Sequence, residues 1–172
     1  MTLLSQLRSA GQAFALALAC LVVAPQPAPA ADPLPEQQCA PQPLLDVRES
    51  ESALGNELEI LSWNIQKASN SGWAEDLAGL GDRIDLAFIQ EASTQARIDG
   101  LLPDLLHRAF AQGYTTSELE TGVMTLSAGL HSMHCKFTAM EPWLGTPKAT
   151  TVTVYPLQDR PERLLALSLI HI

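Results

Sequence analysis

Hydrophobic residues gather in two continuous runs near the middle of the chain, and each run predicts a buried strand. Residues 58–63 (LEILSW) alternate in a pattern apolar enough to be buried on both faces, and residues 84–90 (IDLAFIQ) form a second such run. Between them, residues 73–80 carry apolar side chains at i, i+4 and i+7, which is typical of a short amphipathic helix. This order predicts a βαβ-type unit with neighbouring strands.

The remaining hydrophobic pattern predicts one more helix and three more strands. Ser93 is a suitable N-cap for a helix that ends at Phe110 and that Pro103 divides or kinks. Three further apolar runs are typical of strands, at residues 121–127, 149–155 and 163–172. A short turn that contains proline separates the last two runs, so we expect them to form an antiparallel hairpin.

The first 30 residues have the layout of a secretory signal peptide. One positive charge at Arg8 precedes an apolar run over residues 13–23, and small residues follow up to Ala30. The apolar run is too short to span a bilayer as a helix, which takes about 20 residues. We therefore expect an exported protein, periplasmic or secreted, with no transmembrane segment in the mature chain. Acylation at Cys20, as in a lipoprotein, is the alternative.

The positions of the prolines and cysteines predict an extended arm and a disulfide in the mature chain. Seven of the twelve prolines fall within residues 25–43, so residues 31–56 are predicted to be a Pro-rich extended arm that precedes a folded domain over residues 57–172. After cleavage, Cys39 and Cys135 are the cysteines that remain. In an oxidising compartment such a pair predicts a disulfide, and two free thiols are the alternative.

Composition and charge narrow the function classes. The chain has 172 residues, of which 47% are hydrophobic and 17% charged, which excludes disordered, collagen-like and coiled-coil proteins. A net charge of -9 argues against a protein that coats nucleic acid or anionic lipid by charge alone, because such binding needs clustered Lys and Arg. Chemistry on a phosphate group would therefore require a metal ion.

Two polar residues follow the central strands and are candidates for that chemistry. Asn64 comes directly after the first strand, and Glu91 comes directly after the second. Ligands of open α/β sheets bind at the carboxyl ends of the strands, and a carboxylate oxygen there suits Mg²⁺. A Glu that favours a helix N-terminus is the alternative interpretation of Glu91.

The residues around these positions carry a family resemblance. Trp63 and Asn64 at the end of the first strand, Gln90 and Glu91 at the end of the second, and a last strand ending in His171 resemble the first half of the endonuclease/exonuclease/phosphatase superfamily. That superfamily includes deoxyribonucleases, apurinic endonucleases, bacterial sphingomyelinases and inositol polyphosphate phosphatases. The resemblance implies that Glu91 is the principal ligand of Mg²⁺ or Mn²⁺, that Asn64 assists at the metal and the phosphate, and that His171 contacts the scissile phosphate.

The resemblance also implies a fold and an activity. The fold expected is α/β, namely half of a four-layer α/β sandwich with one mixed sheet, flanking helices and one uncovered sheet face. The superfamily's Gly-Asp-Phe-Asn and Ser-Asp-His motifs do not occur in the 172 residues, so the chain is predicted to be truncated and inactive.

The expected protein is thus an incomplete form of an exported, divalent-metal-dependent hydrolase of phosphodiester or phosphomonoester bonds, monomeric at full length. Its substrate would be a phosphate ester of nucleic acid, of a phospholipid headgroup or of a small molecule. The alternative is a non-catalytic exported α/β binding or interaction module, which would use the uncovered sheet face to contact another chain.

Three other groups are weaker candidates. His131, His134 and Cys135 include zinc-ligand types, but no second ligand pair follows at finger-like spacing. Lys148 opens a strand and is more simply explained as a solvated side chain. Trp143 has the chemistry to stack on a base or a lipid headgroup, and the sequence leaves its role open.

Overall fold

The computed structural model describes residues 36–41 and 52–170. These residues belong to one compact unit, Pro33–Ile172. The predicted signal peptide, residues 1–30, and the predicted phosphate contact, His171, lie outside the described residues. No helix within the described ranges is long and apolar enough to cross a membrane.

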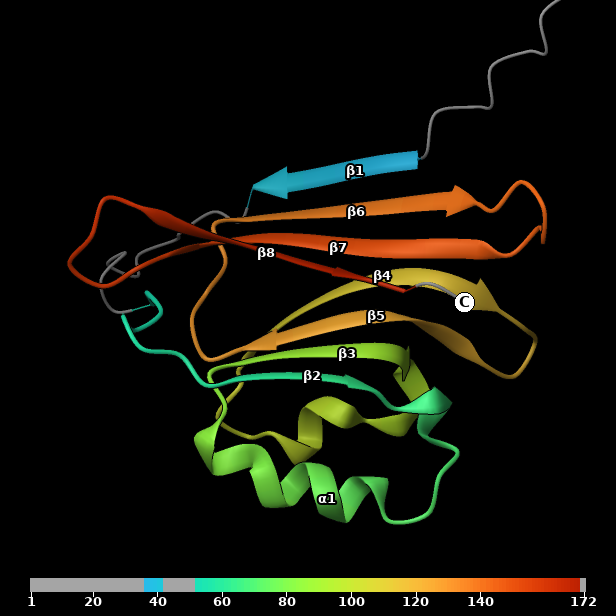
Figure 1. Ribbon diagram of the computed structural model, residues 1–172, viewed down its shortest axis with the longest axis horizontal. Helices are drawn as coiled ribbons and strands as arrows, with labels where there is room; N and C mark the ends of the chain where they lie inside the picture. Colours follow the sequence, from blue (N-terminus) through green and yellow to red (C-terminus); the bar gives the residue numbers. More distant parts are fainter. Residues whose placement is uncertain (1–35, 42–51, 171–172) are drawn as a thin grey trace, which may run out of the picture. The chain divides into compact units, whose positions relative to one another are not determined.

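One four-stranded sheet contains the predicted βαβ unit. Its strands are β2 (Ile60–Asn64), β3 (Leu86–Ser93), β4 (His107–Thr115) and β5 (Glu120–Ser127), in the order β2-β3-β5-β4 (Figure 1). Strands β2 and β3 are parallel neighbours, as the hydrophobic runs predict, and the short helix α1 (Trp73–Leu80) connects them. Strand β5 pairs antiparallel with both β3 and β4.

A second four-stranded sheet is antiparallel throughout. It contains β1 (Glu36–Pro41), β6 (Met133–Met140), β7 (Pro147–Pro156) and β8 (Arg163–Leu169), in the order β1-β6-β7-β8. The predicted hairpin of the last two strands is confirmed as β7 and β8. Strand β1 belongs to the proline-rich segment and lies at the edge of the sheet, where a missing N–H is tolerated.

The predicted fold class is wrong. The protein is not half of an α/β sandwich with one mixed sheet and flanking helices. The described residues are mostly β, with 50% in strands and 17% in helices, and the strands form two sheets of four. The sheet face expected to be uncovered lies against the second sheet, as buried residues from both sheets show. Two segments account for much of the error: residues 93–110, predicted as a helix, and residues 133–140, for which no strand was predicted.

Residues 93–110 contain two short 3-10 turns and the start of a strand. Ser93 does cap a turn, since its Oγ accepts a hydrogen bond from the Gln95 N–H at 3.3 Å, but η4 (Thr94–Ala96) and η5 (Ile98–Leu101) are the only helical segments described there. From His107 onward the chain pairs with β5. Ala109 and Ala111 are buried at the two-residue spacing of a strand, so partner strands overrode a helix-like apolar spacing.

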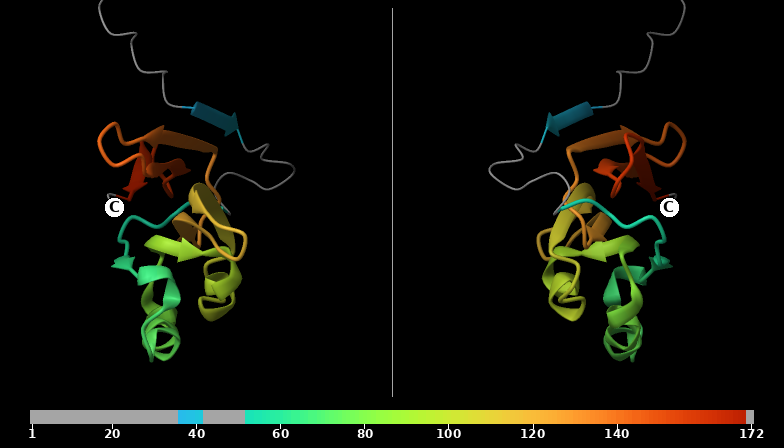
Figure 2. Two further views of the ribbon diagram at one scale, coloured as in Figure 1. Left: turned by 90° about the vertical axis from the view of Figure 1, so that its right-hand side faces the viewer. Right: turned by 90° about the vertical axis from the view of Figure 1, so that its left-hand side faces the viewer.

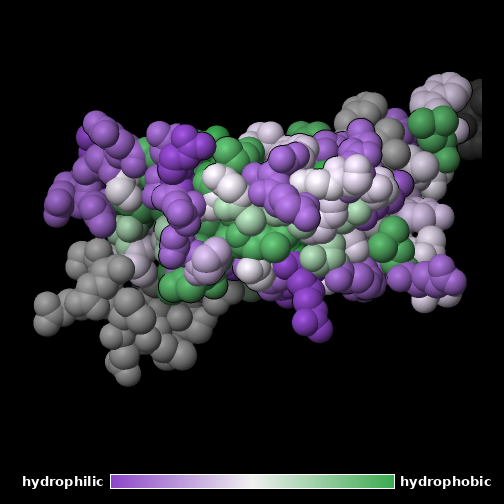
Figure 3. Space-filling view, turned by 90° about the horizontal axis from the view of Figure 1, so that it is seen from below, coloured by the Kyte–Doolittle hydropathy of each residue, from purple (hydrophilic) through white to green (hydrophobic). Residues whose placement is uncertain are grey.

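The hydrophobic core has two levels, one on each face of the β2-β3-β5-β4 sheet. Figures 1 and 2 show α1 and the 3-10 turns on one side of the β2-β3-β5-β4 sheet and the second sheet on the other. A large cluster fills the first level, with Leu77 of α1, Ile89 of β3 and Leu126 of β5 completely buried. The second level includes Leu86 of β3 and Tyr155 of β7. On the outer surface beyond α1, polar side chains surround smaller apolar areas (Figure 3).

Gly122 in β5 provides a test of this packing. A Cβ atom built there would overlap the carbonyl oxygen of Ala111 and lie 2.9 Å from Cζ of the Phe110 ring. Because the first obstacle is backbone, Gly122→Ala is expected to lower the free energy of unfolding by about 2 kcal/mol. Gly79→Ala in α1 is the control, since nothing lies within 4 Å of its Cβ, and helix propensity there favours Ala. Urea unfolding of both variants measures the difference, and equal midpoints would contradict the packing described.

Candidate functional site

Asn64 and Glu91, predicted from separate strands, lie side by side. Asn64 is the last residue of β2 and pairs in register with Gln90 of β3, and Glu91 is the next residue along β3. Their side chains are in direct contact, because Nδ2 of Asn64 donates a hydrogen bond to Oε1 of Glu91 at 3.1 Å. The parallel pairing therefore brings together two groups that are 27 residues apart in the sequence.

Glu91 occupies an irregular position in its strand. The pairing of β3 with β5 shifts register between Gln90 and Ala92, so Glu91 is the extra residue of a β-bulge, and its φ is 49°. A left-handed backbone costs a residue other than glycine about 1–2 kcal/mol. Bulges redirect a side chain and occur frequently beside active sites. The hydrophobic pattern predicted a regular strand end here and contained no sign of this bulge.

The loop after β2 fixes the orientation of the Asn64 amide. Ile65 is buried and its N–H donates to the carbonyl oxygen of Gln90 at 3.1 Å. The N–H of Gln66 then donates to Oδ1 of Asn64 at 2.9 Å. Since a backbone N–H occupies the amide oxygen, the amide nitrogen faces Glu91. Asn64 thus holds the carboxylate in place.

Lys67 is a third member of the site that the sequence analysis missed. Its Nζ lies 3.8 Å from Oε2 of Glu91, and the two side chains are 46% and 19% exposed. The residue belongs to a short 3-10 turn, η2 (Gln66–Ala68). No periodic pattern in this segment predicts that a lysine there lies near Glu91. The available signal was its position three residues after Asn64, in the loop that follows the half-exposed edge strand β2.

The donors at this site suit some metals better than others. Glu91 supplies a carboxylate, and Asn64 supplies an amide whose oxygen already accepts one hydrogen bond. Within the described ranges, no group of three or more His, Cys, Asp or Glu side chains is placed to hold a metal. One carboxylate fits Mg²⁺, which keeps several waters and takes further oxygens from substrate phosphates.

Gln90 connects this site to the second sheet. Its Nε2 donates to Oγ of Ser62 at 3.3 Å and to Oγ of Ser168 at 3.4 Å. Ser168 is buried near the end of β8, so that end of β8 approaches the end of β3. His171 follows three residues later and lies outside the described residues.

The other sequence candidates are placed elsewhere. Cys135 is bonded to Cys39, the pair expected from the sequence, and this bond removes it as a thiolate ligand for zinc. Lys148 pairs with Glu141 at 3.0 Å, and the Trp143 side chain is 93% exposed.

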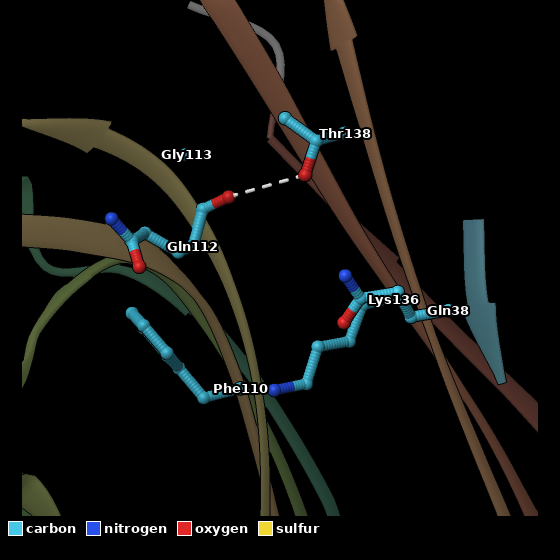
Figure 4. Close-up of a pocket in the computed structure, with 6 residues that line it drawn as sticks. All are labelled: Gln38, Phe110, Gln112, Gly113, Lys136 and Thr138. Carbon is cyan, nitrogen blue, oxygen red and sulfur yellow. Dashed lines mark hydrogen bonds between the residues drawn. The ribbon is translucent and has the colours of Figure 1, made fainter. Parts of the chain in front are cut away.

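A separate groove of about 380 Å³ lies between β1, β4 and β6 (Figure 4). Thr138 Oγ1 donates there to the carbonyl oxygen of Gln112 at 3.5 Å. Its lining residues do not include the predicted site residues; they are Gln38, Phe110, Gln112, Gly113, Lys136 and Thr138.

Comparison with known proteins adds relatives whose names state no activity. No protein-family model matches the chain, and no solved structure matches it. A UPF0294 protein of Yersinia pseudotuberculosis is 34% identical over 122 residues, which cover 66% of this chain and 44% of the relative. A UPF0294 protein of Vibrio cholerae is 30% identical over 129 residues, which cover 70% of this chain and 44% of the relative. The chain is therefore similar to UPF0294 proteins and spans less than half the length of these relatives.

Proposed function

We propose that this chain carries the metal-binding and phosphate-binding part of an exported, divalent-metal-dependent hydrolase of phosphate esters. The observation that carries the proposal is the contact of Asn64 with Glu91 at the paired ends of β2 and β3. The two dipeptides that end these strands, Trp63-Asn64 and Gln90-Glu91, are those that resemble the endonuclease/exonuclease/phosphatase superfamily.

The negative net charge of the protein is the reason for proposing a metal ion at this site. A phosphate ester approaching a protein of net charge -9 needs a local cation, and a divalent metal supplies one. When bound, Mg²⁺ or Mn²⁺ neutralises phosphate oxygens and lowers the pKa of an attacking water. In this chain Glu91 would hold the metal through its carboxylate, and Asn64 would keep that carboxylate in one orientation. Export agrees with the Cys39–Cys135 disulfide, since such bonds persist in oxidising compartments.

The first test is metal binding. Mn²⁺ titration, followed by the electron paramagnetic resonance of the free ion, is expected to show one site on the wild-type chain. Glu91→Gln is expected to weaken that binding by more than about tenfold, because the neutral amide no longer offers a charged oxygen. Glu141→Gln is a matched control: Glu141 is similarly buried, with a side chain 16% exposed, and pairs with Lys148.

The activity is tested with a generic phosphodiester, bis(p-nitrophenyl) phosphate. Mg²⁺-dependent cleavage that Glu91→Gln abolishes and Glu141→Gln leaves intact supports the proposal. We expect little or no turnover by the 172 residues alone, since the Gly-Asp-Phe-Asn and Ser-Asp-His motifs are absent from them, so metal binding is the deciding test. Absence of Mn²⁺ binding, or binding that Glu91→Gln leaves unchanged, would refute the proposed function.

The second candidate is a non-catalytic exported interaction module. The observation that favours it is an apolar row on the edge strand β8, where Leu165, Leu167 and Leu169 are 64%, 53% and 51% exposed. A row of this kind invites contact with another chain. Metal-independent association that Leu167→Lys abolishes and Glu91→Gln leaves unchanged would favour this module over the hydrolase.

A further inference from the structure

Lys67 lies in the most strained stretch of backbone that the structure describes. Gln66, Lys67 and Ala68 have φ values of 48°, 60° and 60°, and none of them is glycine. Each left-handed residue of this kind is strained, because its Cβ crowds the following carbonyl oxygen. Three in succession persist only when surrounding contacts determine the backbone, and such strain gathers at functional sites.

The loop has the contacts that this strain requires. Ser69 Oγ donates to the carbonyl oxygen of Gln66 at 2.7 Å, and Asn70 Nδ2 donates to Oε1 of Gln66 at 3.1 Å. The N–H of Ala68 donates to the carbonyl oxygen of Ile65 at 2.9 Å, and Ile65 is itself buried. The backbone position of Lys67 is therefore set by its loop neighbours.

The ion pair with Glu91 is too weak to explain the strain. Its atoms lie 3.8 Å apart, and the lysine side chain is 46% exposed. Pairs as exposed as this contribute little to stability, less than three strained residues cost. The ion pair by itself therefore does not account for the strained loop, so a role in ligand binding explains the position of Lys67 better than a role in stability.

We infer that Lys67 binds the phosphate group of the substrate and that, without metal, its ammonium group rests against Oε2 of Glu91. The inference rests on the proposed function. Asn64 already contacts Oε1, so Oε2 is the oxygen that Lys67 and a metal ion would share. A divalent cation there repels the ammonium group, and an anionic phosphate attracts both cations. Lysine suits this task because it meets a phosphate as a mobile point charge.

This arrangement predicts that removing the lysine charge raises the affinity for the metal ion and lowers the affinity for phosphate. Lys67→Asn keeps a residue that tolerates a left-handed backbone. The variant is expected to bind Mn²⁺ about threefold more tightly, because a competing cation is gone. It is expected to bind dimethyl phosphate about tenfold more weakly at saturating Mn²⁺, because a charged phosphate contact is lost. Electron paramagnetic resonance measures the first affinity, and ³¹P relaxation caused by bound Mn²⁺ measures the second.

Two further variants control the experiment. Lys67→Arg keeps the charge and is expected to hold both affinities within about twofold. Lys136→Asn removes an exposed cation from β6 and is expected to change neither. Weaker binding of both ligands by Lys67→Asn would show a structural role and overturn the inference.

If Lys67→Asn binds dimethyl phosphate as tightly as the wild-type chain does, the inference is also overturned. The proposed function still stands in that case, provided that Mn²⁺ binding depends on Glu91. If the wild-type chain binds no Mn²⁺, or if Glu91→Gln binds it equally well, the proposed function fails and this inference fails with it.

Discussion

Removing the disulfide between Cys39 and Cys135 is expected to lower the free energy of unfolding by about 4 kcal/mol. The two cysteines are 96 residues apart, so their bond closes a long loop in the unfolded chain and reduces its conformational entropy. In the folded protein the bond ties the edge strand β1 to β6, where Cys39 and Cys135 are paired directly. This is the largest effect on stability that we expect from a single covalent change.

The measurement is urea unfolding of the wild-type protein, with and without reductant, beside the double variant Cys39→Ala, Cys135→Ala. Reduced wild type and double variant are expected to unfold at the same lower midpoint, and reductant should not affect the variant. Hydrogen exchange of β1 amides separates local from global effects, because an edge strand held by one neighbour opens first. Equal midpoints for the oxidised and reduced wild-type protein would contradict this prediction.

Acidification is expected to destabilise the protein by about 3 kcal/mol through one buried histidine. Burial, with smaller contributions from His131 and Lys136, lowers the pKa of His134 from 6.5 to about 4. The unfolded chain therefore takes up a proton at a higher pH than the folded protein does. Stability is fully present above pH 6.5 and declines as the pH falls towards about 4.

The surroundings of His134 explain the direction of this shift. His131 and His134 are 3% and 9% exposed, and their rings meet edge to face with centroids 5.7 Å apart. Both ring nitrogens of His131 and Nε2 of His134 lack hydrogen-bond partners within the described part of the chain. Burial also lowers the pKa of His131, with a further contribution from His107, and the Tyr155 ring lies 6.1 Å from that of His131. The named neighbours thus provide no carboxylate to stabilise a protonated ring.

Comparison of variants separates the contribution of His134 to the pH dependence of stability from the contribution of the carboxylates, which also titrate in acid. His134→Leu is expected to lose about 3 kcal/mol less stability than wild type between pH 6.5 and 4. His107→Gln is the control and should keep most of the wild-type pH dependence, since burial lowers the pKa of His107 by less than that of His134 and His107 is only a secondary cause of the shift at His131. Chemical unfolding at several pH values measures both, and parallel curves for wild type and His134→Leu would falsify the assignment.

The pairing of Asn64 with Glu91 could be anticipated from sequence, but its geometry could not. Two apolar runs joined by a helical connection predict parallel neighbours, and the ends of parallel strands meet at one sheet edge. The bulge at Glu91 depends on the register of β3 against β5, which begins 29 positions later at Glu120. The position of Lys67 depends on left-handed loop residues that nothing in their side-chain types favours.

Local periodicity by itself determined α1, the strands β2, β3, β5, β7 and β8, and the direction of the β2–β3 and β7–β8 pairs. It could do so because each pattern is complete within one segment or between segments joined by a short connection. Only the tertiary structure decided that residues 107–115 form β4, that residues 133–140 form β6, and that the strands divide into two sheets. Those elements form because distant partners satisfy their backbone hydrogen bonds and bury one face, and neither effect is visible in local spacing.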